Sequence, residues 1–238
     1  MAGIGIKLNK FFDKGTVTGY LAGSGYSVVT TIAPMLLVIA DILAMQKILG
    51  YSDAAYGSRQ LFQATILYIF VFALLASAPL NAVLSRYVSD VIFNETYSDI
   101  MAAFHLGLWI SMAIDAIMVV PFAIHEYIVG GVDIVYVVTS VCCFIALSLV
   151  FYTMLYLSLC KDYGKISLFY FIGMAITLGI SYIFVNKFNM EITYSMLLAM
   201  TIGFIIIASL GYALLRQYFT QNSKNYKDVL QYIVRFRK

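Results

Sequence analysis

Residues Asp133–Leu157 read DIVYVVTSVCCFIALSLVFYTMLYL, and the only charged residue in this stretch is Asp133, at its first position. A helix rises 1.5 Å per residue, so a helix of this length can cross a hydrocarbon core of about 30 Å. The whole chain of 238 residues is 62% hydrophobic and 11% charged, whereas soluble domains contain about 25% charged residues. A soluble chain this short could not hide so much apolar surface. The sequence therefore predicts an integral membrane protein.

Five further apolar runs have a similar length. We predict an all-α fold with six transmembrane helices at Tyr26–Ile48, Gln60–Val83, Ile100–Ile124, Asp133–Leu157, Ile166–Asn186 and Ile192–Leu215. The connections between them are short and leave no room for a soluble catalytic domain. We divide the chain into a cytoplasmic amphipathic segment (1–18), a six-helix transmembrane lobe (19–216) and a basic amphipathic tail or inter-lobe linker (217–238).

The distribution of Lys and Arg over the connections predicts the orientation. Twelve of the 15 basic residues fall on one side of the predicted spans, namely Lys7, Lys10, Lys14, Arg86, Lys161, Lys165, Arg216, Lys224, Lys227, Arg235, Arg237 and Lys238. The other side has Lys47, Arg59 and Lys187. Cytoplasmic loops carry the excess of positive charge, so both termini are expected in the cytoplasm, as an even number of spans also requires. The basic residues thus report orientation, and no nucleic-acid partner is expected.

Both ends of the chain combine apolar residues at helical spacing with basic residues. The apolar stripes are Ile4, Leu8, Phe11 and Phe12 at the beginning, and Tyr226, Val229, Leu230, Ile233 and Phe236 at the end. Such segments lie on the anionic surface of the lipid bilayer. The tail could instead be an interaction arm or a calmodulin-like target.

Ionisable side chains inside a span are costly and point to function. Asp115 shares one helical face with Ser111, and Glu126 lies at the outer end of that face. In the first span, Ser27, Thr30, Pro34 and Asp41 align on another face. We hypothesise that the two stripes line a hydrated cavity, where Asp41 and Asp115 contact a polar or cationic substrate or carry a proton. The alternative is that each carboxylate hydrogen-bonds a neighbouring helix.

Three prolines, Pro34, Pro79 and Pro121, lie one in each of the first three spans and are expected to permit helix bends. The sequence contains no phosphate-binding loop and no metal-binding His motif. Cys142, Cys143 and Cys160 match no zinc spacing and are interpreted as packing residues. We therefore expect no catalytic residues, no metal and no cofactor.

Several short motifs resemble the Pel exopolysaccharide transporter family (PelG-like proteins). They are Met1–Gly5 before the basic stretch, Ala33-Pro34, Phe62-Gln63, Ala78-Pro79, Arg86–Asp90 (RYVSD) and Lys161–Tyr163 (KDY). The resemblance covers essentially the whole chain. It departs from the family at position 33, where Gly is expected before the proline.

The resemblance implies one six-helix lobe of a two-lobe exporter in the multidrug/oligosaccharidyl-lipid/polysaccharide superfamily, whose members are about twice as long. It implies export of a hexosamine-rich, partly cationic polysaccharide across the bacterial inner membrane. Expected partners are a second six-helix lobe, a glycosyltransferase and membrane-anchored subunits of the synthase. Family precedent assigns no site residues. We expect Arg86 and Asp90 to tie the cytoplasmic end of the second span to a neighbour or partner.

Two other functions remain open on the sequence. A proton- or sodium-coupled exporter of small cations would use Asp41 and Asp115 as coupling groups. A non-transporting anchor subunit of a polysaccharide synthase would instead depend on its basic ends.

Overall fold

The computed structural model describes residues 17–94, 96–159, 163–220, 226 and 229–231, with side chains from Ile32 onward except those of Leu159 and Tyr163. The long helices are α2 (Val17–Ile48), α3 (Tyr56–Phe93), α4 (Asp99–Ile128), α5 (Ile134–Leu159), α6 (Tyr163–Phe188) and α7 (Ile192–Tyr218), with a short 3-10 helix η1 (Tyr51–Asp53). The described residues contain no strand. The apolar stripe predicted at the N-terminus lies outside the described residues, as do Ile233 and Phe236 of the stripe predicted in the tail. Of the three tail residues that are described, Val229 is buried, whereas Tyr226 and Leu230 are exposed.

Five helices, α3 to α7, are long and apolar enough to cross a membrane. The chain is therefore a multi-pass membrane protein. Helix α2 occupies the position of the first predicted span and is 32 residues long, but its role as a sixth span stays a prediction.

The helices extend beyond the apolar runs that predicted them. The largest difference is in α3, which continues from the predicted end at Val83 to Phe93. The added segment contains Ser85, Arg86 and Asp90, which lower the local hydropathy without breaking a helix. An apolar window marks where a helix leaves the hydrocarbon, whereas the helix itself ends where its hydrogen bonds end.

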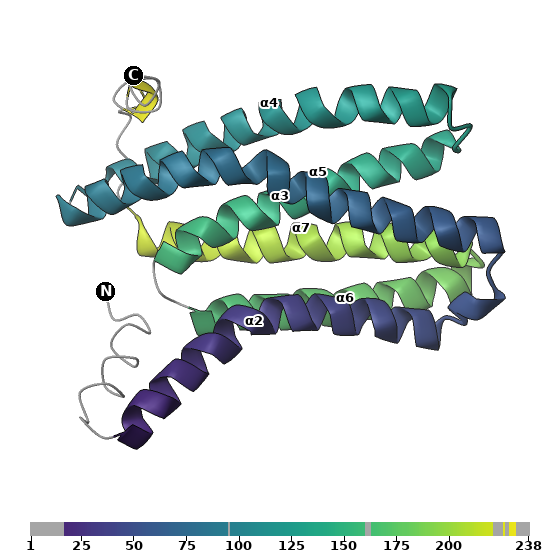
Figure 1. The fold of residues 1–238 in the computed structure, drawn as a ribbon, viewed down its shortest axis with the longest axis horizontal. Coiled ribbons are helices and arrows are strands. Elements are labelled where there is room, and N and C mark those ends of the chain that lie inside the picture. The colour runs from purple at the N-terminus through teal and green to yellow at the C-terminus, as the bar shows by residue number, and fades with distance from the viewer. Residues whose placement is uncertain (1–16, 95, 160–162, 221–225, 227–228, 232–238) are drawn as a thin grey trace.

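The helices form an antiparallel bundle with α5 and α7 at its centre (Figure 1). Helix α7 packs on α5 and α6, α5 also packs on α3 and α4, and α2 packs on α6. Helices α2 and α4 therefore lie on opposite sides of the central pair. The α2–α3, α4–α5 and α6–α7 connections meet at one end of the bundle, which we call the η1 end.

Tyr51 connects η1 to the beginning of α3 at the η1 end. Its hydroxyl donates a hydrogen bond to the Arg59 carbonyl at 2.9 Å, and its ring meets Phe62 edge-on at 5.8 Å between centroids. Burial raises the pKa of Tyr51, although the Arg59 charge acts in the other direction. The hydroxyl thus stays protonated and remains a donor at physiological pH. Gly50 leads from α2 into η1 with φ 66°, a conformation in which residues with a Cβ are disfavoured.

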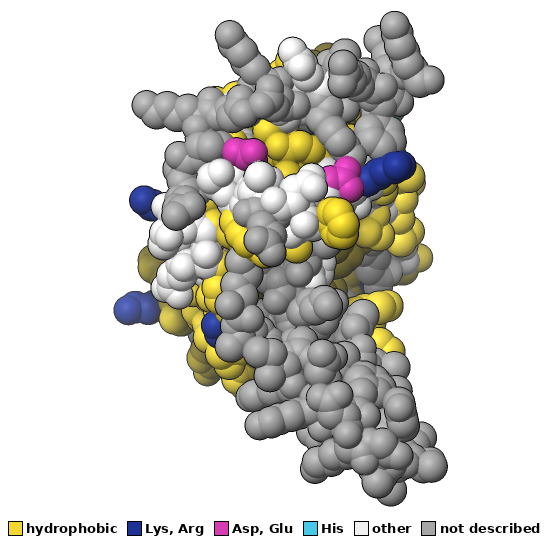
Figure 2. Space-filling view, turned by 90° about the vertical axis from the view of Figure 1, so that its left-hand side faces the viewer, with side chains coloured by type: hydrophobic (Ala, Val, Ile, Leu, Met, Phe, Trp, Pro, Cys, Tyr) yellow, Lys and Arg dark blue, Asp and Glu magenta, His cyan; other side chains and the backbone are white. Residues whose placement is uncertain are grey.

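The end opposite η1 carries exposed basic side chains. Arg86, Lys165 and Arg216 lie there on α3, α6 and α7, and Figure 2 shows Lys and Arg side chains at the edges of this face. Lys165 Nζ donates to the Tyr218 hydroxyl at 2.8 Å, which links the beginning of α6 to the end of α7.

Two helix backbones come close at Gly173 and Gly203, where α6 crosses α7. A Cβ added at Gly203 would collide with Thr177 Oγ1, and one added at Gly173 would collide with Ile207. Small residues let membrane helices gain van der Waals contact in this way. The crossing joins the α2–α6 pair to the central helices.

Replacing Gly203 with Ala should lower the free energy of unfolding by about 1–3 kcal/mol. The new methyl would displace Thr177, whose hydroxyl donates to the Gly173 carbonyl at 2.9 Å. Denaturant or thermal unfolding of the purified protein in detergent measures the change. The matched control is Gly179→Ala on α6, where an added Cβ meets no described atom within 4 Å. Equal stability of the two variants would contradict the packing argument.

Candidate functional site

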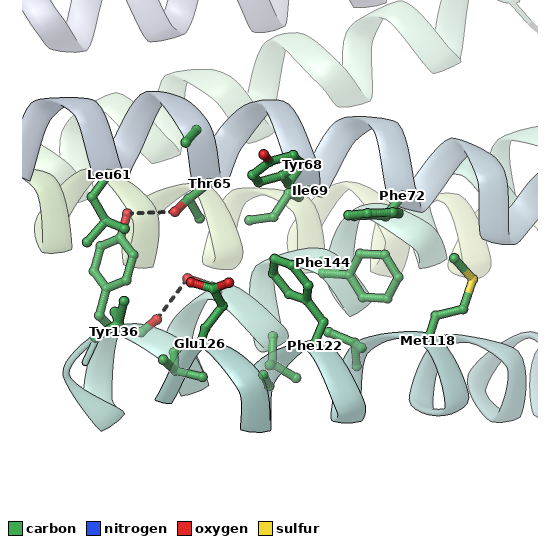
Figure 3. Close-up of a pocket in the computed structure, with 17 residues that line it drawn as sticks. Leu61, Thr65, Tyr68, Ile69, Phe72, Met118, Phe122, Glu126, Tyr136 and Phe144 are labelled. Carbon is green, nitrogen blue, oxygen red and sulfur yellow. Dashed lines mark hydrogen bonds between the residues drawn. The ribbon is translucent and has the colours of Figure 1, made fainter. Parts of the chain in front are cut away.

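A pocket of about 290 Å³ lies between α3, α4 and α5 toward the η1 end. Figure 3 shows side chains from the three helices converging on it. Most of its wall is apolar, and its larger apolar residues are Leu61, Ile69, Phe72, Met118, Phe122 and Phe144. We call it the three-helix pocket.

Aromatic rings bridge the α3 and α4 walls of the pocket. The Phe122 ring lies 6.0 Å from that of Tyr68 and 5.9 Å from that of Phe72, centroid to centroid. Tyr68 and Phe72 stack on each other at 6.0 Å, one helical turn apart. Tyr68 and Phe122 are 49% and 40% exposed, so these rings form the rim of an open pocket and do not seal it.

Glu126 is the only charged residue among the described residues that line the pocket. Figure 3 shows its carboxylate pointing into the pocket from α4. The side chain is 34% exposed, and Glu126 Oε1 lies 3.4 Å from Nδ1 of the neighbouring His125. A carboxylate in such an apolar setting favours a cationic or hydrogen-bond-donating ligand group.

The hydroxyl groups of the pocket are partly committed to the protein itself. Tyr136 donates to Thr65 Oγ1 at 3.2 Å, which ties α5 to α3. Ser140 donates to the carbonyl of Tyr136 at 2.8 Å. These bonds leave Glu126 as the group best placed to bind a polar part of a ligand.

Asp115 lies on α4 three turns further from the η1 end than Glu126. Ser148 on α5 donates to Asp115 Oδ1 at 3.0 Å, and the carboxylate is 1% exposed. Asp115 Oδ2 has no hydrogen-bond partner among the described residues. Ser111, one turn further along, is also 1% exposed. One face of α4 thus runs from buried polar groups to the pocket.

Asp41 lies elsewhere in the bundle. It is 5% exposed on α2, whose main neighbour is α6, and its Oδ2 has no partner among the described residues. Asp41 and Asp115 therefore stand on opposite sides of the α5–α7 pair (Figure 1). A cavity lined by both would need a surface beyond the described residues, so the shared cavity stays a prediction.

The other residues predicted for the site or for helix bends lie on α2, α3 and α4. Ser27 and Thr30 lie on α2, but their side chains are outside the described part of the chain. Pro34, Pro79 and Pro121 lie inside α2, α3 and α4, and Figure 1 shows the first portion of α2 turning away from the rest. Arg86 and Asp90 are exposed on the last turns of α3, and each has an interaction partner.

The described residues contain no group of three or more His, Cys, Asp or Glu side chains that could hold a metal ion. Cys142 is exposed and Cys143 is buried, and both are free thiols. The side chain of Cys160 lies outside the described residues.

Sequence reasoning identified the α4 face but missed the three-helix pocket. Thr65, Tyr68 and Tyr136 come from two helices, and hydropathy does not report which helices are neighbours. The i, i+4 pair Tyr68 and Phe72 was the available signal for an aromatic face on α3.

The fold and the pocket together define a helical, multi-pass membrane protein with buried carboxylates. Residues 1–238, the whole chain, match the family described as "PelG: Putative exopolysaccharide Exporter (EPS-E)". The chain belongs to this exporter family, as the short motifs indicated. No curated protein and no solved structure matches it.

Replacing Ser148 with Ala should lower the free energy of unfolding by about 1–3 kcal/mol, because the buried Asp115 carboxyl would lose its hydrogen-bond donor. The double variant Asp115→Leu/Ser148→Ala should recover part of this loss, since neither polar partner then remains. A double-mutant cycle on purified protein in detergent measures the coupling. Ser140→Ala is the control because that hydroxyl bonds only a carbonyl of its own helix. Additive effects of the two substitutions would refute the pairing.

Proposed function

We propose that this chain is one six-helix lobe of an exporter that moves a hexosamine-rich, partly cationic exopolysaccharide across the bacterial inner membrane. The observation that carries the proposal is the family match over residues 1–238. The five candidate spans agree with a transporter that works inside the bilayer. The proposed partners are a second six-helix lobe, a cytoplasmic glycosyltransferase and membrane-anchored synthase subunits.

In this proposal α2 is the sixth span and both termini are cytoplasmic. The η1 end then faces the periplasm, and the end with Arg86, Lys165 and Arg216 faces the cytoplasm. The described residues alone hold three basic residues at each end, since Lys47, Arg59 and Lys187 lie toward the η1 end. The proposed orientation therefore rests on the basic residues outside the described part of the chain, which are Lys161 and those of the two terminal segments.

The buried carboxylates Asp41 and Asp115 are the proposed contacts for the cationic substrate or for a coupling proton, with Ser27, Thr30 and Ser111 beside them. Both are nearly inaccessible, and each has an oxygen without a partner among the described residues. An uncompensated polar atom inside a membrane protein costs free energy. The presence of two such oxygen atoms, on different helices, supports a role for Asp41 and Asp115 beyond packing.

Single cysteines should establish the orientation. In a variant with Cys142, Cys143 and Cys160 replaced by Ala, Ser52→Cys places an exposed thiol at the η1 end and Ser89→Cys places one near the opposite end. A thiol reagent that cannot cross the inner membrane should label Ser52→Cys in intact spheroplasts. It should label Ser89→Cys only after the membrane is permeabilised. The reverse pattern would show that the lobe is inserted the other way.

Export is tested in the bacterium that encodes the chain, by deleting the gene and restoring it as wild type or as a variant. Deletion should abolish extracellular hexosamine polymer, and Asp41→Asn and Asp115→Asn should each reduce it about tenfold or more, the loss expected when a charged contact is removed. Hexosamine released by acid hydrolysis of the medium and of the cells measures secretion and retention, and immunoblots confirm equal protein levels.

Two results would contradict this proposal. Unchanged secretion together with lost efflux of small cationic dyes would assign the chain to the small-cation exporters. Full secretion by both carboxylate variants, with loss only on truncation from Lys224 onward, would assign it to the anchor subunits.

A further inference from the structure

We propose that the three-helix pocket binds one acyl chain of a phospholipid with a primary amine in its headgroup, and that Glu126 binds the ammonium. The phospholipid class is that of phosphatidylethanolamine. The proposal rests on the lobe being embedded in a bilayer and is independent of what the protein exports.

The wall of the pocket suits a hydrocarbon chain better than a sugar polymer. Sugars need many hydrogen-bond partners, but the Tyr136 and Ser140 hydroxyl hydrogens are already donated within the protein. The volume of about 290 Å³ is at the lower limit of small-molecule sites. It can hold part of one chain, packed against Phe72, Phe122 and Phe144.

The opening of the pocket faces lipid. Its rim residues Tyr68 and Phe122 are partly exposed, and exposed apolar side chains flank them on the same helices. These flanking residues are Leu67 and Val71 on α3 and Val120 and Ile124 on α4. Since five of the helices are long and apolar enough to span a membrane, a surface of this kind meets acyl chains and not water.

The depth of Glu126 matches the position of a headgroup. It lies two residues beyond Ile124, where the apolar run of α4 ends and the helix leaves the hydrocarbon. The pocket then continues along α4 to Met118, about 12 Å deeper at 1.5 Å per residue. A polar group at the boundary with an apolar space beneath it has the polarity pattern of a phospholipid.

The charge of Glu126 selects among headgroups. A primary ammonium can donate charge-assisted hydrogen bonds to the carboxylate. A choline headgroup has the charge but no N–H donor, and a glycerol headgroup leaves the lipid with a net negative charge that Glu126 repels. His125 is the nearest competing cation, but it is 63% exposed and is charged only when protonated. The expected order of affinity is ethanolamine, then choline, then glycerol.

Native mass spectrometry of the full purified chain measures this order. The probes are dioleoyl phosphatidylethanolamine, phosphatidylcholine and phosphatidylglycerol, added at equal concentration. Wild type should retain one phosphatidylethanolamine about tenfold more strongly than phosphatidylglycerol, the preference expected of a charge-assisted hydrogen bond. Glu126→Gln should abolish the preference. Glu191→Gln, an exposed carboxylate at the η1 end outside the pocket, should keep it.

A second measurement locates the chain in a bilayer. The sequence has one Trp, Trp109, so the indole of the double variant Trp109→Phe/Phe122→Trp reports on the pocket alone. In vesicles that differ only in which lipid carries bromine on its acyl chains, brominated phosphatidylethanolamine should quench this indole more than brominated phosphatidylglycerol. Adding Ala123→Phe, which fills the pocket, should remove the difference.

Three results would overturn the proposal. The first is equal retention of the three lipids by wild type, or a preference that survives Glu126→Gln. The second is a lipid-free dimer that Ala123→Phe dissociates, since a second copy would then fill the pocket. The third is Glu126-dependent binding of tetraphenylphosphonium without any lipid preference, since the pocket would then bind small organic cations. None of these results depends on polysaccharide export, so the lipid-binding proposal and the export proposal are tested separately.

Discussion

The fold depends on one constraint: backbone N–H and C=O groups inside a bilayer must find partners within the protein. Long, uninterrupted helices meet this requirement, which explains why α3 to α7 each run for 26 residues or more. Because of this constraint, the insertion of a helix into the membrane and its packing against another helix have different causes. Hydropathy places a helix in the membrane, but it does not attract one apolar helix to another, because lipid is equally apolar. The bundle must therefore be specified by close packing and by a few polar contacts.

The structure shows both kinds of contact. The crossing of α6 and α7 relies on Gly173 and Gly203 for close approach. Polar contacts join the other helices: Asp115 with Ser148 between α4 and α5, Tyr136 with Thr65 between α5 and α3, and His105 with Tyr212 at 3.2 Å between α4 and α7. Tyr152 on α5 also donates to the Phe104 carbonyl of α4 at 2.8 Å. A Cβ added at Gly107 would collide with that Tyr152 hydroxyl, so packing and hydrogen bonding are matched at the same place.

These contacts explain what the sequence could and could not predict. Apolar runs located the helices, and the 3.6-residue period placed Ser111, Asp115 and Glu126 on one face of α4. Neither signal indicates which helix a face meets. The packing of α2 on α6, and hence the separation of Asp41 from Asp115, follows from side-chain fit between segments far apart in the sequence. The pocket was missed for the same reason, because Thr65 and Tyr136 become neighbours only after α3 and α5 have packed.

The distribution of polar groups in the bundle also bears on where a polysaccharide could pass. The three-helix pocket is apolar and holds a single charge, whereas Asp115 is sealed between α4 and α5 and Asp41 lies against α6 on the far side. A hydrated polymer needs a continuous row of polar partners, and these separated groups do not form one within the described residues. In a two-lobe exporter, that path would therefore be completed by a second surface. The bundle would then contribute Asp41 and Asp115 from its interior, and the lipid-facing pocket would lie outside that path.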